Sequence, residues 1–267
     1  MAIRMIAMDL DGTLLRDDKT LSAENIAAVK RAVDAGVVVV IASARPPRAV
    51  KAIYEALGLD TIQINYNGAA HYDQVRGRFV KHLPLEAGFV REMVNAARDL
   101  DEQVYMSLEV MDKWYTDGVD DSLLTETSKH FKPDLLGELD ELFEEPVTKL
   151  MLLAPKERLA KVHAMVLERF GERIAIHMSD EHLIQIVDPS VDKEHSVREL
   201  AGYYGIDRVE VMAIGDAQND AGMIAWAGLG VAVGNAWDEA KVAADEVVGS
   251  NEENGVAEAI ERFVLGA

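Results

Sequence analysis

The segment Met-Ile-Ala-Met-Asp-Leu-Asp-Gly-Thr-Leu-Leu, residues 5–15, decides the fold. The apolar run from Ile3 to Met8 is typical of a short buried strand, and two aspartates stand directly after it. Ser22 then occupies the position of a helix N-cap, before apolar residues at helical spacing that stop at Gly36. The segment therefore predicts a strand followed by a helix.

The same alternation recurs at both ends of the chain. Val37 to Ile41 contains only apolar residues and so shows no alternation of apolar and polar side chains, which is typical of a strand covered on both faces of a parallel sheet. A third run spans Thr61 to Ile64, and two more, Val209 to Ile214 and Leu229 to Val233, follow near the C-terminus. This pattern predicts an α/β fold with a Rossmann-like, doubly wound parallel sheet.

The middle of the chain has a different pattern. Amphipathic helices are mixed there with alternating strand candidates such as Lys149 to Leu153 and Arg173 to His177. We therefore expect residues 84–186 to form an inserted α+β domain, and residues 1–83 and 187–267 to form the α/β core.

Composition excludes several classes of partner. The 267 residues carry 27 Lys and Arg against 47 Asp and Glu, a formal net charge of −20. So acidic a chain repels phosphate backbones and anionic lipid, so we expect neither a nucleic acid nor a membrane partner. An anionic ligand is compatible with this charge only if local groups attract it.

The absence of cysteine excludes disulfides, thiol catalysis and zinc sites built on sulfur. The purest apolar run, Val37 to Ala42, is far shorter than the roughly 20 residues that span a bilayer. Asp9 interrupts the N-terminal apolar run too early for a signal peptide. We expect a cytoplasmic protein that is a monomer or a small homo-oligomer.

Polar residues end four of the apolar runs: Asp9, Ser43, Asn65 or Asn67, and Asp216. Because ligands bind beyond the carboxyl ends of parallel strands, we expect these side chains to converge. Carboxylates this close repel one another, and a divalent cation between them would relieve the repulsion. An all-oxygen set that also draws on Asp11 and Asp220 suits Mg²⁺ best.

Asp-x-Asp-Gly alone has other interpretations, a simple turn or a calcium loop. The calcium-loop pattern needs further spaced acids and a Glu, which residues 13–20 do not supply.

Two motifs together make a family resemblance specific. Asp-Leu-Asp-Gly-Thr-Leu-Leu at 9–15 and Gly-Asp-Ala-Gln-Asn-Asp at 215–220 resemble the haloacid dehalogenase superfamily of phosphotransferases. The middle insert and Asn67-Gly68-Ala69 make the chain similar to the Cof-like phosphatases, which carry an inserted α+β (type IIB) cap. The resemblance implies Mg²⁺-dependent hydrolysis of a small metabolite's phosphate monoester, with sugar phosphates as the favoured class.

The resemblance also implies a role for each matching residue. Asp9 would be the nucleophile that forms an aspartyl-phosphate, and Asp11 the general acid and base. Mg²⁺ would be held by Asp9, the Asp11 backbone carbonyl, Asp216 and Asp220. The phosphate and substrate would be held by residues around the strand ends: Leu10 and Ala44 through their amides, Ser43, Arg45, Asn67, Lys193 and Asn219.

The chain departs from the family pattern at two motifs. Ser43-Ala44-Arg45 replaces the usual Thr-Gly-Arg and keeps the hydroxyl, whereas Lys193-Glu194 replaces Lys-Gly and places a carboxylate beside the phosphate-binding lysine. Two alternatives therefore stay open. One is a phosphomutase or other phosphotransferase that uses the same aspartyl-phosphate, and the other is a phosphometabolite-binding protein with weak catalysis.

Overall fold

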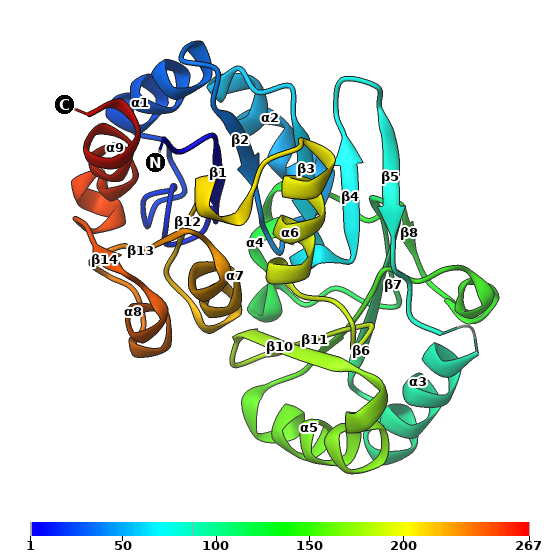
Figure 1. Cartoon of the computed structure of the whole chain (residues 1–267). Helices are drawn as coiled ribbons and strands as arrows, with labels where there is room; N and C mark the ends of the chain where they lie inside the picture. The colour runs from blue at the N-terminus through cyan, green and yellow to red at the C-terminus, as the bar shows by residue number, and fades with distance from the viewer. Residues whose placement is uncertain (1, 87, 267) are drawn as a thin grey trace. The chain divides into compact units, whose positions relative to one another are not determined.

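A computed structural model describes residues 2–86 and 88–266, and the chain divides into two compact units (Figure 1). The core unit comprises Met1–Val80 and Asp192–Ala267, and the insert unit comprises Lys81–Val191. The expected insert, 84–186, lies inside the second of these ranges.

A five-stranded parallel sheet forms the centre of the core unit. Its strand order is β14-β13-β12-β1-β2, and all four pairings are parallel. The strands are β1 (Met5–Met8), β2 (Val38–Ile41), β12 (Val211–Gly215), β13 (Leu229–Ala232) and β14 (Glu246–Val247). The first apolar run of the chain therefore lies in the interior of the sheet, between β2 and β12.

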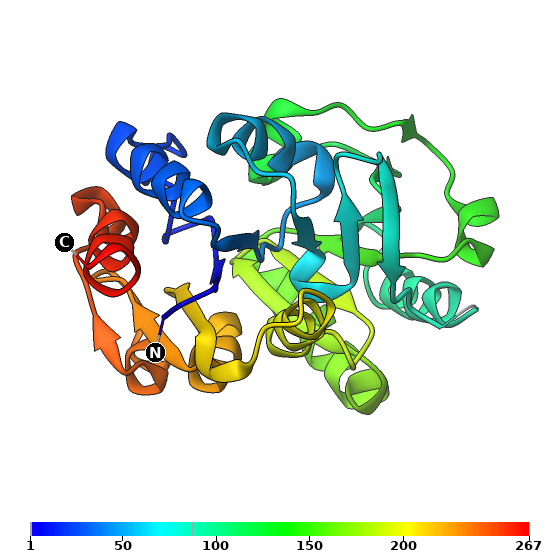
Figure 2. The same cartoon turned by 45° about the horizontal axis from the view of Figure 1, so that its top comes forward.

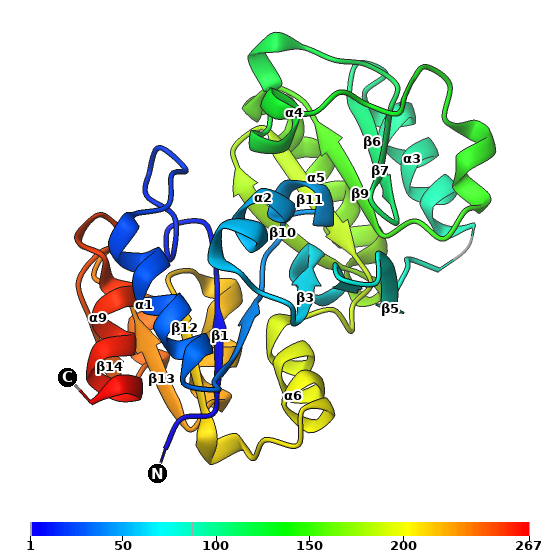
Figure 3. The ribbon, with the colours of Figure 1, turned by 90° about the horizontal axis from the view of Figure 1, so that it is seen from above.

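Helices cover both faces of this sheet, because successive side chains of a strand point to opposite sides. Ile6 and Met8 pack with α1 (Ala23–Asp34), α2 (Pro47–Leu57), α8 (Asp238–Ala243) and α9 (Gly255–Ile260). Met5 and Ala7 pack with α6 (Lys193–Tyr203) and α7 (Ala221–Trp226). Figures 2 and 3 show α1 lying beside α9, in agreement with their contacts. The prediction of a doubly wound parallel sheet is confirmed.

The third predicted strand belongs to a different sheet. β3 (Ile62–Asn65) heads a three-stranded sheet with β4 (Ala70–Asp73) and β5 (Arg78–His82), and it pairs antiparallel with β4. A parallel bridge between Ala42 and Ile64 still ties β3 to the end of β2. The sequence did not predict β4 and β5, because β5 is only partly buried and lacks an apolar run.

The insert unit is built on a six-stranded sheet of order β10-β11-β9-β6-β7-β8. Its pairings are antiparallel except for β7 with β8. Side chains of α3 and α5 share one apolar cluster with β6, β9 and β11. The elements are α3 (Phe89–Leu100), β6 (Tyr105–Val110), β7 (Lys113–Thr116), α4 (Glu126–His130), β8 (Leu135–Leu136), β9 (Lys149–Leu153), α5 (Lys156–Phe170), β10 (Ala175–Asp180) and β11 (Leu183–Val187).

This mixture of helices with a largely antiparallel sheet is the α+β pattern expected for the insert. Lys149 to Leu153 forms β9 as predicted, while the Arg173 candidate begins as a strand only at Ala175. Within the described part of the chain, none of the helices combines the length and the apolar character that crossing a membrane requires.

Candidate active site

Three buried carboxylates meet at the carboxyl edge of the core sheet. Asp9 follows β1 and Asp216 follows β12, two parallel neighbours whose last paired residues are Met8 and Ile214. The Asp9 backbone N–H donates to the carbonyl of Ile214 at 3.0 Å, which holds the two strand ends together. Asp220 reaches the same point from the short turn that precedes α7.

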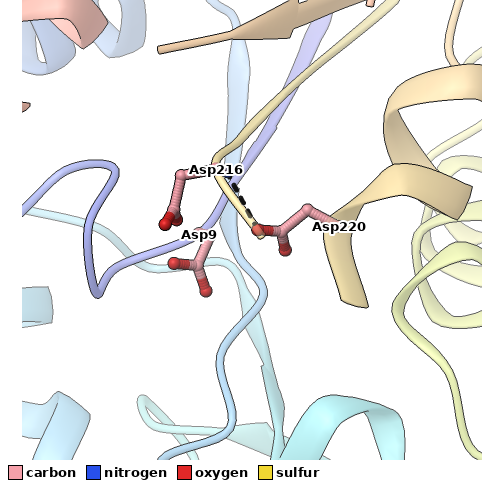
Figure 4. A group of neighbouring side chains, drawn as sticks. All are labelled: Asp9, Asp216 and Asp220. Atoms are coloured by element: carbon pink, nitrogen blue, oxygen red, sulfur yellow. Dashed lines mark hydrogen bonds between the residues drawn. The ribbon is translucent and has the colours of Figure 1, made fainter. Parts of the chain in front are cut away.

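Carboxylate oxygens of Asp9, Asp216 and Asp220 lie within 4.8 Å of one another (Figure 4). Burial raises the pKa of Asp9, Lys193 opposes the rise, and the charges of Asp220 and Asp216 add to it. Burial, together with Asp220 and Asp11, raises the pKa of Asp216 to about 6 even though Thr13 hydrogen-bonds to it. A cation beside the group would therefore favour the ionised forms of these carboxylates.

The donor set fits a hard divalent cation. The group contains three carboxylates and neither imidazole nor thiolate, and Mg²⁺ prefers oxygen ligands of this kind. The expected set also included Asp11, whose carboxylate lies outside this group. Only the Asp11 backbone carbonyl therefore remains as the expected ligand from that residue.

Lys193 supplies a fixed positive charge to the group. It is the first residue of α6, whose N-cap is Asp192, and it is 1% exposed. Its Nζ donates to Asp9 Oδ1 and to Asp220 Oδ1, both at 2.6 Å. Burial alone would lower its pKa, but the two carboxylates hold the pKa above its ordinary value, so the ammonium stays charged.

Glu194, the departure from the family pattern, does not compete with this arrangement. Its carboxylate pairs with Arg198 one helical turn later, with 3.3 Å between Oε1 and Nη1. Lys193 instead turns inward to Asp9 and Asp220. Adjacent residues on a helix point in different directions, so the carboxylate beside the lysine in sequence pairs elsewhere.

Local hydrogen bonds orient the two later aspartates. Asp220 Oδ2 accepts from the backbone N–H groups of Asp216 and Ala217, each at 3.0 Å. Thr13 Oγ1 donates to Asp216 Oδ1 at 2.7 Å. Thr13 belongs to the first motif, but the sequence alone indicated no role for it, because its partner Asp216 is 203 positions away.

Gly12 makes the close approach of these segments possible. Its φ is +85°, and a Cβ at this position would lie 2.5 Å from Asp216 Oδ2. Any larger residue would both strain the backbone and push the carboxylate aside.

Asp11 faces cations rather than the other carboxylates. Arg45 Nε donates to Asp11 Oδ2 at 2.7 Å and Arg45 Nη2 to Asp11 Oδ1 at 2.6 Å, while Lys19 Nζ lies 3.0 Å from Oδ1. Burial would raise the pKa of Asp11, but Arg45 and Lys19 outweigh it and hold the pKa below its usual value. The guanidinium that was expected to bind substrate therefore lies on Asp11, and Lys19 was not among the expected site residues.

Three of the remaining expected residues are joined by hydrogen bonds. Ser43 is buried, and its carbonyl accepts from the Asn67 backbone N–H at 3.0 Å. Asn219 Nδ2 donates to Asn67 Oδ1 at 3.0 Å, so Ser43, Asn67 and Asn219 form one hydrogen-bonded chain. The Leu10 side chain is buried in the core, and its carbonyl accepts from the N–H groups of Thr13 and Leu15 at 3.3 and 2.8 Å. Ala44 follows Ser43 directly.

Comparisons with known proteins agree with this geometry. The model of the haloacid dehalogenase-like hydrolase family matches residues 6–260. The chain is 33% identical to the 5-amino-6-(5-phospho-D-ribitylamino)uracil phosphatase YitU of Bacillus subtilis (strain 168), over 97% of each chain. A second phosphatase of that name from the same organism, YwtE, is 30% identical over 99% of each chain.

A solved structure is similar over nearly the whole chain. A haloacid dehalogenase-like hydrolase from Bacteroides thetaiotaomicron has a TM-score of 0.88 at 29% identity, covering 97% of this chain and 99% of that one. The family resemblance read from the two aspartate motifs is thereby confirmed. The chain belongs to the haloacid dehalogenase-like hydrolase family.

Proposed function

We propose that the protein hydrolyses the phosphate monoester of a small metabolite, with Mg²⁺ as cofactor and Asp9 as nucleophile. The observation that carries the proposal is the buried group of Asp9, Asp216 and Asp220 with the Lys193 ammonium bound to two of its members. Phosphoryl transfer needs neutralised negative charge and a fixed line of attack, and Lys193 together with a bound Mg²⁺ would supply both at Asp9.

In the first step, a carboxylate oxygen of Asp9 attacks phosphorus and the bond from phosphorus to the ester oxygen breaks. Arg45 and Lys19 favour the ionised form of Asp11, so its carboxylate first takes up a proton from solvent. It then passes that proton to the departing oxygen, which leaves as an alcohol. In the second step, water attacks phosphorus of the aspartyl-phosphate, Asp11 takes the proton of that water, and Asp9 returns to its carboxylate form.

Asp9, Asp216 and the Asp11 carbonyl would hold Mg²⁺, with Asp220 beside them. Bound there, the cation supplies positive charge to the transferring phosphoryl oxygens. Lys193 holds Asp9 and Asp220 in place and adds its own charge. Ser43, Asn219 and the amides of Leu10 and Ala44 would bind the remaining phosphate oxygens.

The substrate class follows from the charge of the chain and from its relatives. A net charge of −20 favours a small anion over a polyanionic chain. The two Bacillus subtilis relatives are named for a substrate with a phosphate on a ribityl chain. We therefore place phosphorylated sugars and sugar alcohols first among candidate substrates.

The direct test is phosphate release from a panel of sugar phosphates, sugar-alcohol phosphates, nucleotides and cofactor phosphates, ranked by kcat/KM with Mg²⁺ present. We expect hydrolysis of several panel members, none by Asp9→Asn, and none in excess chelator. Wild-type turnover by Asp9→Asn would contradict the nucleophile assignment. Transfer of the phosphoryl group to an added sugar, measured by product analysis, would identify a phosphotransferase instead, and absence of all turnover would favour a binding protein.

A further inference from the structure

Two cations hold the side chain of Asp11 from two directions. Arg45 donates to both carboxylate oxygens through Nε and Nη2, at 2.7 and 2.6 Å, and Lys19 approaches Oδ1 at 3.0 Å. A bidentate guanidinium fixes the plane of a carboxylate as well as its position, which a single hydrogen bond cannot do. The orientation of Asp11 is therefore set by its neighbours and not by its own backbone alone.

The backbone of Arg45 is itself held in place. Its N–H donates to Ser43 Oγ at 3.1 Å, and its carbonyl accepts from Asn65 Nδ2 at 3.2 Å and from the Tyr66 N–H at 3.4 Å. The Arg45 side chain is 17% exposed. Ser43, expected as a phosphate-binding hydroxyl, thus also fixes the residue that reaches Asp11.

Lys19 lies in a turn in which its own backbone adopts an uncommon conformation, and from there its side chain reaches Asp11. Its φ is +66°, a region that non-glycine residues rarely adopt. Asp18 Oδ1 accepts from the Thr20 N–H and hydroxyl, and the Lys19 N–H donates to Arg16 O at 2.9 Å. Strained backbone of this kind persists where the surroundings hold it and is concentrated at functional sites.

We propose that Arg45 is a positioning residue that acts through Asp11, and not a ligand of the substrate phosphate. Lys19 has the same task with a weaker, single contact. The inference rests on the proposed function, because the orientation of Asp11 affects turnover only if Asp11 moves the proton. General acid–base catalysis contributes about 10²- to 10⁴-fold to rate, and it depends on a carboxylate held in the right place.

The test is a double-mutant cycle with saturating Mg²⁺ on the sugar phosphate of the panel that the unchanged protein hydrolyses best, because its alkoxide leaving group needs a proton. Its members are the unchanged protein, Arg45→Met, Asp11→Asn and the double variant, with kcat and KM measured for each. The inhibition constant of inorganic phosphate is measured in parallel as a binding readout. Slow variants are followed under single turnover with excess enzyme, and thermal denaturation verifies that each variant is folded.

We expect Arg45→Met to lower kcat by about tenfold or more with little change in KM. In the Asp11→Asn background the same substitution should lower kcat by less than about twofold, because the group through which it acts is gone. The inhibition constant of phosphate should stay within about threefold. Equal losses in both backgrounds, or a phosphate constant raised by about tenfold, would instead make Arg45 a phosphate ligand and overturn the inference.

Two further variants show whether the effect of Arg45 comes from the two parallel donors of its guanidinium, from its charge, or from a general loss of stability. Arg45→Lys keeps the charge but not the two parallel donors, so its kcat should stay near that of Arg45→Met; full recovery would contradict positioning by the fork. Arg76→Met removes an arginine of the same unit whose side chain is 62% exposed, and should leave kcat unchanged. If the unchanged protein hydrolyses nothing, the proposed function fails as well, whereas additive losses in an active, Asp9-dependent enzyme count against Arg45 alone.

Discussion

Lys193 Nζ lies 2.6 Å from Asp9 Oδ1, and both side chains are almost completely buried. The same ammonium lies 2.6 Å from Asp220 Oδ1, so one lysine bridges two carboxylates from opposite ends of the chain. In this position the lysine is at once a structural cation and the neighbour of the proposed nucleophile.

Lys193→Met should therefore affect stability and activity together. It leaves two buried carboxylates without their cation, and breaking a buried ion pair typically costs about 3–5 kcal/mol. We expect a loss of this order in the free energy of unfolding, measured by urea denaturation without Mg²⁺, and a kcat lower by about 100-fold or more. Lys30→Met, on the exposed side of α1, serves as the control and should change neither.

Mg²⁺ should stabilise the fold. A cation that binds only the folded state at about 100 times its Kd adds about 2.7 kcal/mol. Thermal denaturation with Mg²⁺ and with excess chelator should show the difference. Asp216→Asn removes one carboxylate of the group and should abolish most of the Mg²⁺-dependent rise in Tm; an undiminished rise would place the cation elsewhere.

A methyl group at Gly12 should damage the site, and Gly36 offers a matched control. Both glycines have nearly the same positive φ, +85° and +83°, but a Cβ at Gly36 meets nothing within 4 Å. Gly36→Ala should lose about 1–2 kcal/mol from backbone strain alone. Gly12→Ala should lose more in urea denaturation and should also lose activity, because its Cβ displaces Asp216.

The insert unit should lose stability in mild acid through His82. Burial lowers the pKa of His82 below its ordinary 6.5, and its Nε2 lies 2.8 Å from Thr148 Oγ1. The unfolded chain therefore binds a proton at a pH where the folded protein does not. The free energy of unfolding is therefore fully retained above pH 6.5, and it declines as the pH falls from 6.5 through the lowered pKa of His82 in the folded protein.

Thermal denaturation between pH 5 and 8 would measure this effect, because this range extends about 1.5 units to either side of the ordinary histidine pKa. His82→Gln should flatten the dependence below about pH 6.5, whereas His130→Gln, at an exposed position of α4, should not. An identical pH profile for His82→Gln and the unchanged protein would exclude His82 as the cause.

The sequence predicted the strand ends well, because residues such as Asp9 and Asp216 follow apolar runs whose parallel pairing is strongly constrained. It indicated that the side chains at these ends would converge, but not which hydrogen-bonded pairs they form. The bidentate pair of Arg45 with Asp11 spans 34 positions, and the hydrogen bond of Thr13 to Asp216 spans 203. Such pairs depend on side-chain rotamers and on the turn at Gly12, which no periodicity encodes. The strands β4 and β5 were not predicted, because β5 is only partly buried and the mostly buried β4 contains polar residues such as His71 and Asp73.

The bridge from Asp9 to Lys193 joins residues 184 positions apart, and it bears on how the protein matures during synthesis. β1 is synthesised well before one of its two neighbours in the sheet, β12, which begins only at Val211. Until that strand arrives, β1 presents an open edge that can pair with other chains. A chain interrupted anywhere in the insert would contain the proposed nucleophile Asp9 but none of Lys193, Asp216 and Asp220. On the proposed mechanism, such an incomplete chain would be inactive while its β1 edge remains open to aggregation.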